Sequence, residues 1–113
     1  MDTIYSSSSH AQKSAIKIIR ISGKECQIIP EIFSFKPTKP RVATLRKLYD
    51  SSNDLIDNAI VIFFPGPSSV TGEDVYEIHV HGSLIIEKKI YESLEKRKKF
   101  RIAEKVNSQK ELF

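Results

Sequence analysis

Polar and apolar side chains alternate along residues 75–81 of the chain. The polar ones, which could bind protons, a metal or a ligand, are Glu77, His79 and His81. The apolar ones are Tyr76, Ile78 and Val80. Because successive side chains of a β-strand point to opposite faces, each set would share one face. We therefore predict a strand with one face in the core and a second face that can hold something polar.

A metal site is one chemistry that this polar row could supply. Alternate residues on a strand face lie about 6.5–7 Å apart, and a His-x-His pair at that spacing can chelate zinc or iron. A catalytic zinc takes three protein ligands and keeps one position open, which agrees with a set made of Glu77, His79 and His81. The sequence lacks the many short strands of a metal-binding barrel, so this set is the weaker alternative.

Motifs for nucleophilic or nucleotide chemistry are missing from the sequence. Gly23-Lys24 resembles a phosphate loop only superficially, because Glu25 takes the place of the hydroxyl residue and no glycine precedes at the required spacing. Cys26 is the single cysteine, has no histidine nearby in sequence, and is expected to be a small buried residue in a reducing compartment. We predict no catalytic residue and no GTP hydrolysis by this chain alone.

Length and composition predict one globular domain in the cytoplasm. The chain has 113 residues and a net charge of +4, and it contains no apolar run long enough to span a membrane and no signal pattern. Much of its basic excess comes late, at Lys88, Lys89, Lys96, Arg97, Lys98, Lys99 and Arg101. Such a cluster could contact phosphates. The commoner alternative is a solvated helix face whose last cations oppose the macrodipole.

The hydrophobic periodicity predicts five strands and two helices. The strands are expected at residues 2–5, 15–21, 42–49, 56–64 and 75–81, and the nearly continuous apolar run at 56–64 favours a strand covered on both faces. Ser22 and Glu25 have the spacing of a capping box, which predicts a short helix that stops near Pro30.

The second helix is predicted at residues 84–98. Its buried stripe would be Ile86, Ile90 and Leu94, and its outer face would carry the ion pairs Glu92–Lys96 and Glu95–Lys99. Together these elements indicate an α+β domain, a mixed sheet of about five strands with two helices on one face.

The connection between the last two predicted strands has the composition of an ordered turn. Pro65, Gly66 and Pro67 predict a rigid bend, and Gly72 a backbone conformation that other residues resist. Thr71, Glu73 and Asp74 are expected to cap turns rather than to bind a ligand.

Several blocks together resemble a known family. They are DTI at 2–4, IIRISG at 18–23, PR at 40–41, LID at 55–57, FPGPSSVTGEDVYEIHVHG at 64–82 and RIA at 101–103. In this order and spacing they resemble the amino-terminal domain of the tRNA-modification GTPase family called MnmE or TrmE. The resemblance implies a fold similar to the folate-binding domain of aminomethyltransferases.

The resemblance also implies a cofactor and partners. The cofactor would be a reduced folate, 5-formyl- or 5,10-methylene-tetrahydrofolate, whose one-carbon unit serves the modification of a wobble uridine. The partners would be a second copy of the chain, the flavoprotein MnmG and tRNA, with no membrane involved.

Two residues match the folate-contacting positions of that family, Arg20 and Glu77. One carboxylate can accept from the adjacent ring N–H and amino donors of a pterin, and a guanidinium keeps its charge and a planar fork of donors. His81 also matches the strand of the family. The alternative for Arg20 and Glu77 is that they only pair with each other across the sheet.

The resemblance ends near residue 103. We therefore predict a folate-binding domain over residues 1–103 and a divergent tail over 104–113, and the lysine that the family uses in that region is not assigned to Lys110. Residues 10–13 replace a glycine-rich loop of the family. A second hypothesis follows, a ligand-free homodimerisation or interaction module of the same fold.

Overall fold

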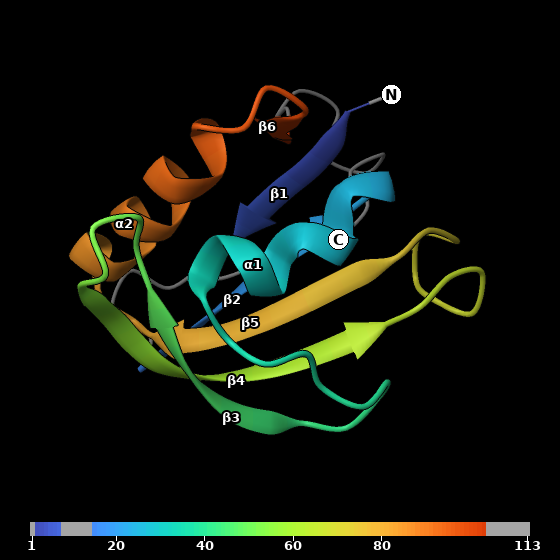
Figure 1. The fold of residues 1–113 in the computed structure, drawn as a ribbon. Helices are drawn as coiled ribbons and strands as arrows, with labels where there is room; N and C mark the ends of the chain where they lie inside the picture. Colours follow the sequence, from blue (N-terminus) through green and yellow to red (C-terminus); the bar gives the residue numbers. More distant parts are fainter. Residues whose placement is uncertain (1, 8–14, 104–113) are drawn as a thin grey trace.

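The computed structural model describes residues 2–7 and 15–103 of the chain, and it is an α+β domain with one mixed sheet (Figure 1). The tail 104–113 and the replaced loop at 10–13 lie outside the described residues. The six strands are β1 (Thr3–Ser7), β2 (Ile16–Ser22), β3 (Thr44–Tyr49), β4 (Leu55–Phe64), β5 (Val75–His81) and β6 (Phe100–Ile102). Their order across the sheet is β3-β4-β5-β2-β1-β6.

Five of these strands are the predicted ones, and β6 is additional. All neighbouring strands are antiparallel except β1 and β6, which run parallel and make the sheet mixed. β6 has three residues, too few for periodicity to reveal, and it contains the Arg101-Ile102 part of the RIA block. The central pairing of β2 with β5 places Arg20 opposite Glu77 and Ile18 opposite His79.

Both helices pack on one face of the sheet, which is called the inner face here. The ring of Tyr76 on β5 lies 6.2 Å from the ring of Phe35, just after the first helix. The ring of Tyr5 on β1 lies 5.0 Å from the ring of Tyr91 on the second helix. The fully buried side chains of the strands on this face include Ile19, Ile21, Ile78, Val80, Ala59 and Val61.

The first helix begins close to the predicted position, but the predictions of its capping residue and of its end were wrong. A 3-10 helix, η1 (Lys24–Ile28), is followed directly by α1 (Ile29–Phe33). Pro30 lies in the first turn of α1, where its missing N–H costs nothing, so it starts a helix instead of stopping one. The capping box is not formed, since the Oγ1 of Thr3 accepts from the backbone N of Glu25 at 2.9 Å.

The second helix, α2 (Leu84–Glu95), begins as predicted and ends earlier. The Oγ of Ser83 caps it by accepting from the backbone N of Ile86 at 3.3 Å. Ile90 and Leu94 are fully buried and Ile86 packs beside them, which confirms the predicted stripe. The expected Glu92–Lys96 and Glu95–Lys99 ion pairs do not form, because α2 ends at Glu95 and the chain turns toward β6.

No helix of residues 2–7 and 15–103 covers the outer face of the sheet. Ile60 and Ile62 of β4 point there and are half-buried, so the prediction of a strand covered on both faces was wrong for β4. The 65–74 loop connects β4 to β5. In that loop Gly72 has a φ of 82°, the Oδ1 of Asp74 accepts from the N of Gly66, and the Oγ1 of Thr71 accepts from the N of Glu73, as predicted for these three residues. The carboxylate of Glu73 caps no turn among the described residues, so that part of the prediction was wrong. No helix among the described residues is long and apolar enough to cross a membrane.

Candidate functional site

Three polar side chains meet at the centre of the outer face. Arg20 on β2 and Glu77 on β5 stand opposite each other in the sheet, and the Nε of Arg20 donates to the Oε2 of Glu77 at 2.9 Å. The Nε2 of His79 lies 3.0 Å from Oε1 of the same carboxylate. Because an ionised carboxylate only accepts, Nε2 of His79 carries the proton in this contact. The structure thus brings Arg20 and Glu77 together, and His79 with them.

The charge of Glu77 is fixed by this environment. Partial burial alone would raise the pKa of Glu77, but the hydrogen bonds from His79 and Arg20 and the charge of Arg20 outweigh it and hold the pKa below the usual value of 4.5. The side chain keeps 18% of its surface exposed. Glu77 is therefore a carboxylate anion at neutral pH that solvent and a ligand can still reach.

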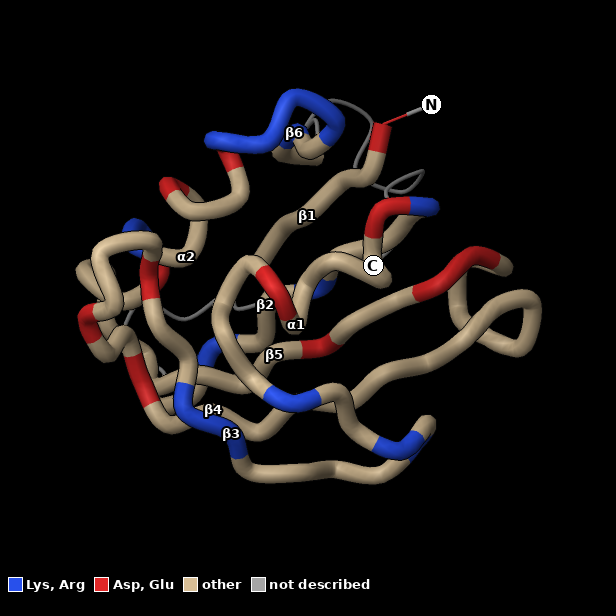
Figure 2. The backbone as a smooth tube through the Cα atoms, viewed as in Figure 1, with Lys and Arg blue, Asp and Glu red and all other residues tan. Residues whose placement is uncertain are grey.

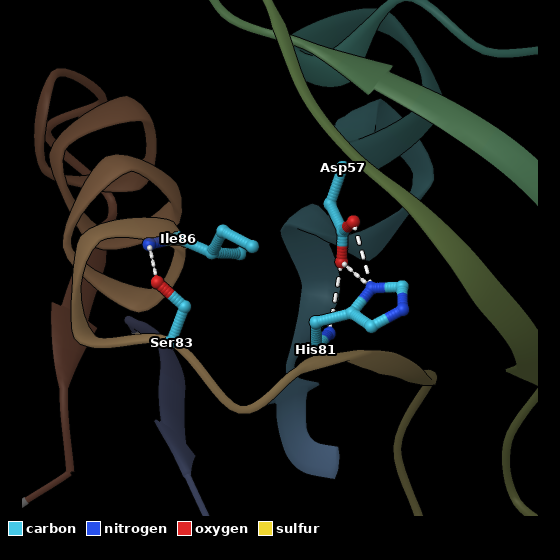
Figure 3. Close-up of polar contacts among 4 residues, drawn as sticks. All are labelled: Asp57, His81, Ser83 and Ile86. Atoms are coloured by element: carbon cyan, nitrogen blue, oxygen red, sulfur yellow. Dashed lines mark hydrogen bonds and ion pairs between the residues drawn. The ribbon is translucent and has the colours of Figure 1, made fainter. Parts of the chain in front are cut away.

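His81 does not join this group. Its Nδ1 lies 2.9 and 3.0 Å from the two carboxylate oxygens of Asp57 on β4, and its backbone N donates to Oδ2 of Asp57 at 2.9 Å (Figure 3). The imidazole of His81 is 67% exposed, whereas Asp57 is 10% exposed. Asp57 therefore satisfies the N–H at the end of β5 and fixes the orientation of the histidine ring.

This arrangement argues against the three-ligand metal site. The carboxylate of Glu77 is held by Arg20 and His79, and His81 turns to another strand. Over residues 2–7 and 15–103, no three side chains of the metal-binding types gather closely enough to hold an ion. Sequence spacing placed Glu77, His79 and His81 on one face correctly, but it could not show that each ring already has a carboxylate partner.

Apolar side chains surround the polar group on the outer face. The register places Ile62 next to Glu77, and Ile60 next to His79, with Ile18 on the other side. Leu45 of β3 pairs with Ile60 and is 61% exposed. The face therefore combines one ionised, hydrogen-bonded centre with an apolar rim, which suits a flat heterocycle or another protein surface.

Two ion-pair residues of the structure were missed by the sequence interpretation. Lys17 on β2 points into the inner face and its Nζ lies 2.7 Å from the Oε1 of Glu87 on α2, with only 8% of the lysine side chain exposed. Asp57 was noted only as part of the LID block. A signal existed for both, since each is a charged residue with apolar neighbours in a strand, Lys17 between Ile16 and Ile18 and Asp57 directly after Leu55-Ile56.

Cys26 has the structural role that the sequence indicated. It is fully buried, and its thiol donates to the backbone oxygens of Ile21 at 3.1 Å and of Asp74 at 3.3 Å. Burial raises the pKa of the thiol to about 12, so the reactive thiolate is absent at neutral pH.

The fold and this face define a class, a small α+β domain that presents a carboxylate–guanidinium pair on the open side of its sheet. Similarity to known proteins identifies a particular family. Residues 3–107 match the family described as the N-terminus of the GTP-binding protein TrmE. The chain is similar to the tRNA modification GTPase MnmE of Anaplasma marginale (strain St. Maries), with 44% identity over 104 residues, 91% of this chain and 23% of the relative.

Other relatives agree with this match. The MnmE of Wolbachia pipientis subsp. Culex pipiens (strain wPip) is 49% identical over 96 residues, 84% of this chain and 22% of the relative. The MnmE of Pelagibacter ubique is 40% identical over 104 residues, 90% of this chain and 24% of the relative. The chain therefore belongs to the TrmE N-terminal domain family, and it spans less than a quarter of the length of these relatives.

Proposed function

We propose that this chain is the part of a tRNA-modifying protein that binds a reduced folate and joins two subunits. The observation that carries the folate proposal is the Arg20–Glu77 pair, held on adjacent strands of a sheet face that no described helix covers, in a member of the TrmE N-terminal family. The residues that carry the site are those that the family resemblance assigned to the ligand. The setting would be the cytoplasm, with tRNA and the flavoprotein MnmG as the partners of the whole protein.

The remaining acceptor capacity of Glu77 fits a pterin. A carboxylate offers about four acceptor positions, and Arg20 and His79 each use one. Two adjacent N–H donors of a heterocycle could take the others without displacing either partner. The depressed pKa of Glu77 keeps both oxygens as acceptors at neutral pH, and charge-assisted bonds of this kind are stronger than neutral ones.

The role of this chain would be to bind and orient. The folate, when bound, supplies a one-carbon unit, and the protein residues hold its ring in place. Arg20 fixes the carboxylate of Glu77 from the neighbouring strand, and Ile62 beside Glu77 offers an apolar surface to the ring.

Calorimetric titration with 5-formyltetrahydrofolate tests this proposal. We expect the wild-type chain to bind at micromolar ligand, and Glu77→Gln to bind about tenfold or more weakly, because a hydrogen bond to a charged group is worth about 1.5–3 kcal/mol. Glu73→Gln is the matched control. Its carboxylate makes no hydrogen bond with the described residues, so the affinity should not change.

Absence of binding by the wild-type chain at high micromolar ligand would overturn the folate site. The second candidate is then a ligand-free module that only joins chains. It is favoured by the mutual pairing of Arg20 and Glu77 and by the apolar rim around them. It predicts that Glu77→Gln and Arg20→Ala leave self-association unchanged.

A further inference from the structure

We infer that the turn between α2 and β6, residues 96–99, is a contact surface for the phosphate backbone of RNA. Lys96, Arg97, Lys98 and Lys99 follow one another there and all four are exposed. Figure 2 shows them as one uninterrupted basic turn beside β6. This inference rests on the proposed function in tRNA modification, to which it adds a place on the domain where the RNA would bind.

The backbone of the turn is fixed at both ends. The N of Arg97 donates to the O of Leu94 at 3.0 Å, and the N of Phe100 donates to the O of Arg97 at 3.1 Å. The N of Thr3 on β1 donates to the O of Lys99 at 2.7 Å, and Phe100 itself is buried in the core. The four cations are therefore presented by an anchored turn and not by a frayed helix end.

The cations of this turn are not neutralised within the described part of the chain. The carboxylates of Glu92 and Glu95, which the sequence pattern paired with Lys96 and Lys99, make no ion pair with them. Lys96 donates instead to the Oγ of Ser51, a neutral partner, at 2.7 Å. Nearby, Arg101 is paired with Asp2 at 3.1 Å. Like charges held together repel one another, and a bound polyanion would relieve that repulsion.

The cations of a second basic segment of the chain are only partly available. Residues 32–49 contain no Asp or Glu, and carry Lys36, Lys39, Arg41, Arg46 and Lys47. However, Arg41 donates to the O of Pro65 and Arg46 to the O of Lys36, so both guanidinium groups support local structure. Charges on the edge strand β3 also have an ordinary purpose, since they discourage strand pairing with other chains. The 96–99 turn is thus the better candidate.

The chemistry of the turn fits phosphates and not bases. Lysine and arginine contact phosphate oxygens in any sequence, whereas base recognition needs stacked aromatic rings or side chains that reach base edges. The aromatic residue closest in sequence, Phe100, is 6% exposed and unavailable for stacking. The surface would therefore position an RNA through its backbone, without sequence preference.

An NMR titration of the 113-residue chain with a short oligouridylate at low salt tests the inference. We expect the amide shifts to concentrate on residues 95–101. Arg97→Gln/Lys98→Gln should weaken binding roughly tenfold or more at about 50 mM salt, and should lower the slope of log K against log salt by about 1.4, since each contact to a single strand contributes about 0.7.

Lys36→Gln/Lys39→Gln removes the same charge from two exposed lysines elsewhere and should have a much smaller effect. Equal losses of RNA affinity in the two double variants would overturn the inference. Amide shifts centred on residues 36–47 would also overturn it, and so would binding to phosphatidylserine vesicles without binding to RNA. Calorimetry with 5-formyltetrahydrofolate on the same samples separates the two proposals. Folate binding without RNA contact rejects the RNA surface alone, and RNA contact without folate binding rejects the folate site alone.

Discussion

At the scale of single residues, the polar centre of the outer face is a balance between burial and charge. Desolvation would neutralise Glu77, and the donors on Arg20 and His79 keep it ionised. The sequence left open whether Arg20 and Glu77 bind a ligand or only pair with each other. Arg20 and Glu77 do pair with each other, but this pairing uses one oxygen of the carboxylate and leaves acceptor capacity, so pairing and ligand binding are compatible.

The pH dependence of stability should report this balance. Because the folded-state pKa of Glu77 is lowered, its stabilising contribution is fully present above the unfolded-state pKa near 4.5 and is lost as the pH falls through the lower folded-state value. Glu77→Gln should therefore lower the free energy of unfolding by about 1–2 kcal/mol at pH near 7, and the difference from wild type should shrink below pH near 4.5. Urea unfolding of both proteins at a series of pH values measures this difference in the free energy of unfolding. A difference that does not vary with pH would contradict a lowered pKa for Glu77.

At the scale of elements, a close approach between β1 and the entry to η1 determines how the first helix starts. Gly23 has a φ of 146°, and a Cβ placed on it would lie 2.5 Å from the Oγ1 of Thr3. That same Oγ1 accepts from the N of Glu25. The glycine thus permits the threonine to cap the 3-10 helix, a task that the sequence pattern had assigned to Ser22.

Gly23→Ala should lower the free energy of unfolding by about 3 kcal/mol or more, because it combines an unfavourable backbone conformation with a clash against Thr3. For a domain of this size that is a fall in Tm of roughly 10–20 °C. Gly72→Ala is the matched control. Its φ of 82° is also positive but open space surrounds it, so only the backbone cost of about 1–2 kcal/mol applies. Equal losses at the two positions in thermal unfolding would refute the clash.

The sequence predicted well the elements whose signal is local. Alternation located β5 and both of its faces, and the i, i+4, i+8 stripe located α2. It failed where a distant contact decides the structure. Pro30 starts α1 because η1 precedes it, β6 exists because β1 offers an edge, and the acceptor that fixes His81 comes from Asp57 on another strand. For the candidate site, the sequence could predict which polar residues lie on one face of β5. It could not predict which carboxylate pairs with each histidine.

At the scale of the whole molecule, the described residues cover the sheet with helices on one side only. Helices α1 and α2 and the loop after α1 bury the inner face, while the outer face keeps Leu45 at 61% and Ile16 at 48% exposure beside half-buried isoleucines. Exposed apolar side chains grouped on one face of a domain often mark a site of interaction with another protein or a ligand. The proposed pairing of two chains would bury this apolar rim and would also bring more protein close to Glu77.

Leu45→Lys tests this use of the outer face. We expect the wild-type chain to sediment as a dimer at tens of micromolar, and the variant to dissociate with a Kd raised about tenfold or more, because a buried unpaired ammonium costs more than the lost leucine contact. Val70→Lys is the control. Val70 is 73% exposed but lies in the loop between β4 and β5, outside the rim, so its replacement should leave the dimer intact. A wild-type chain that stays monomeric at all concentrations would remove the pairing proposal, while equal sensitivity at both positions would place the interface elsewhere.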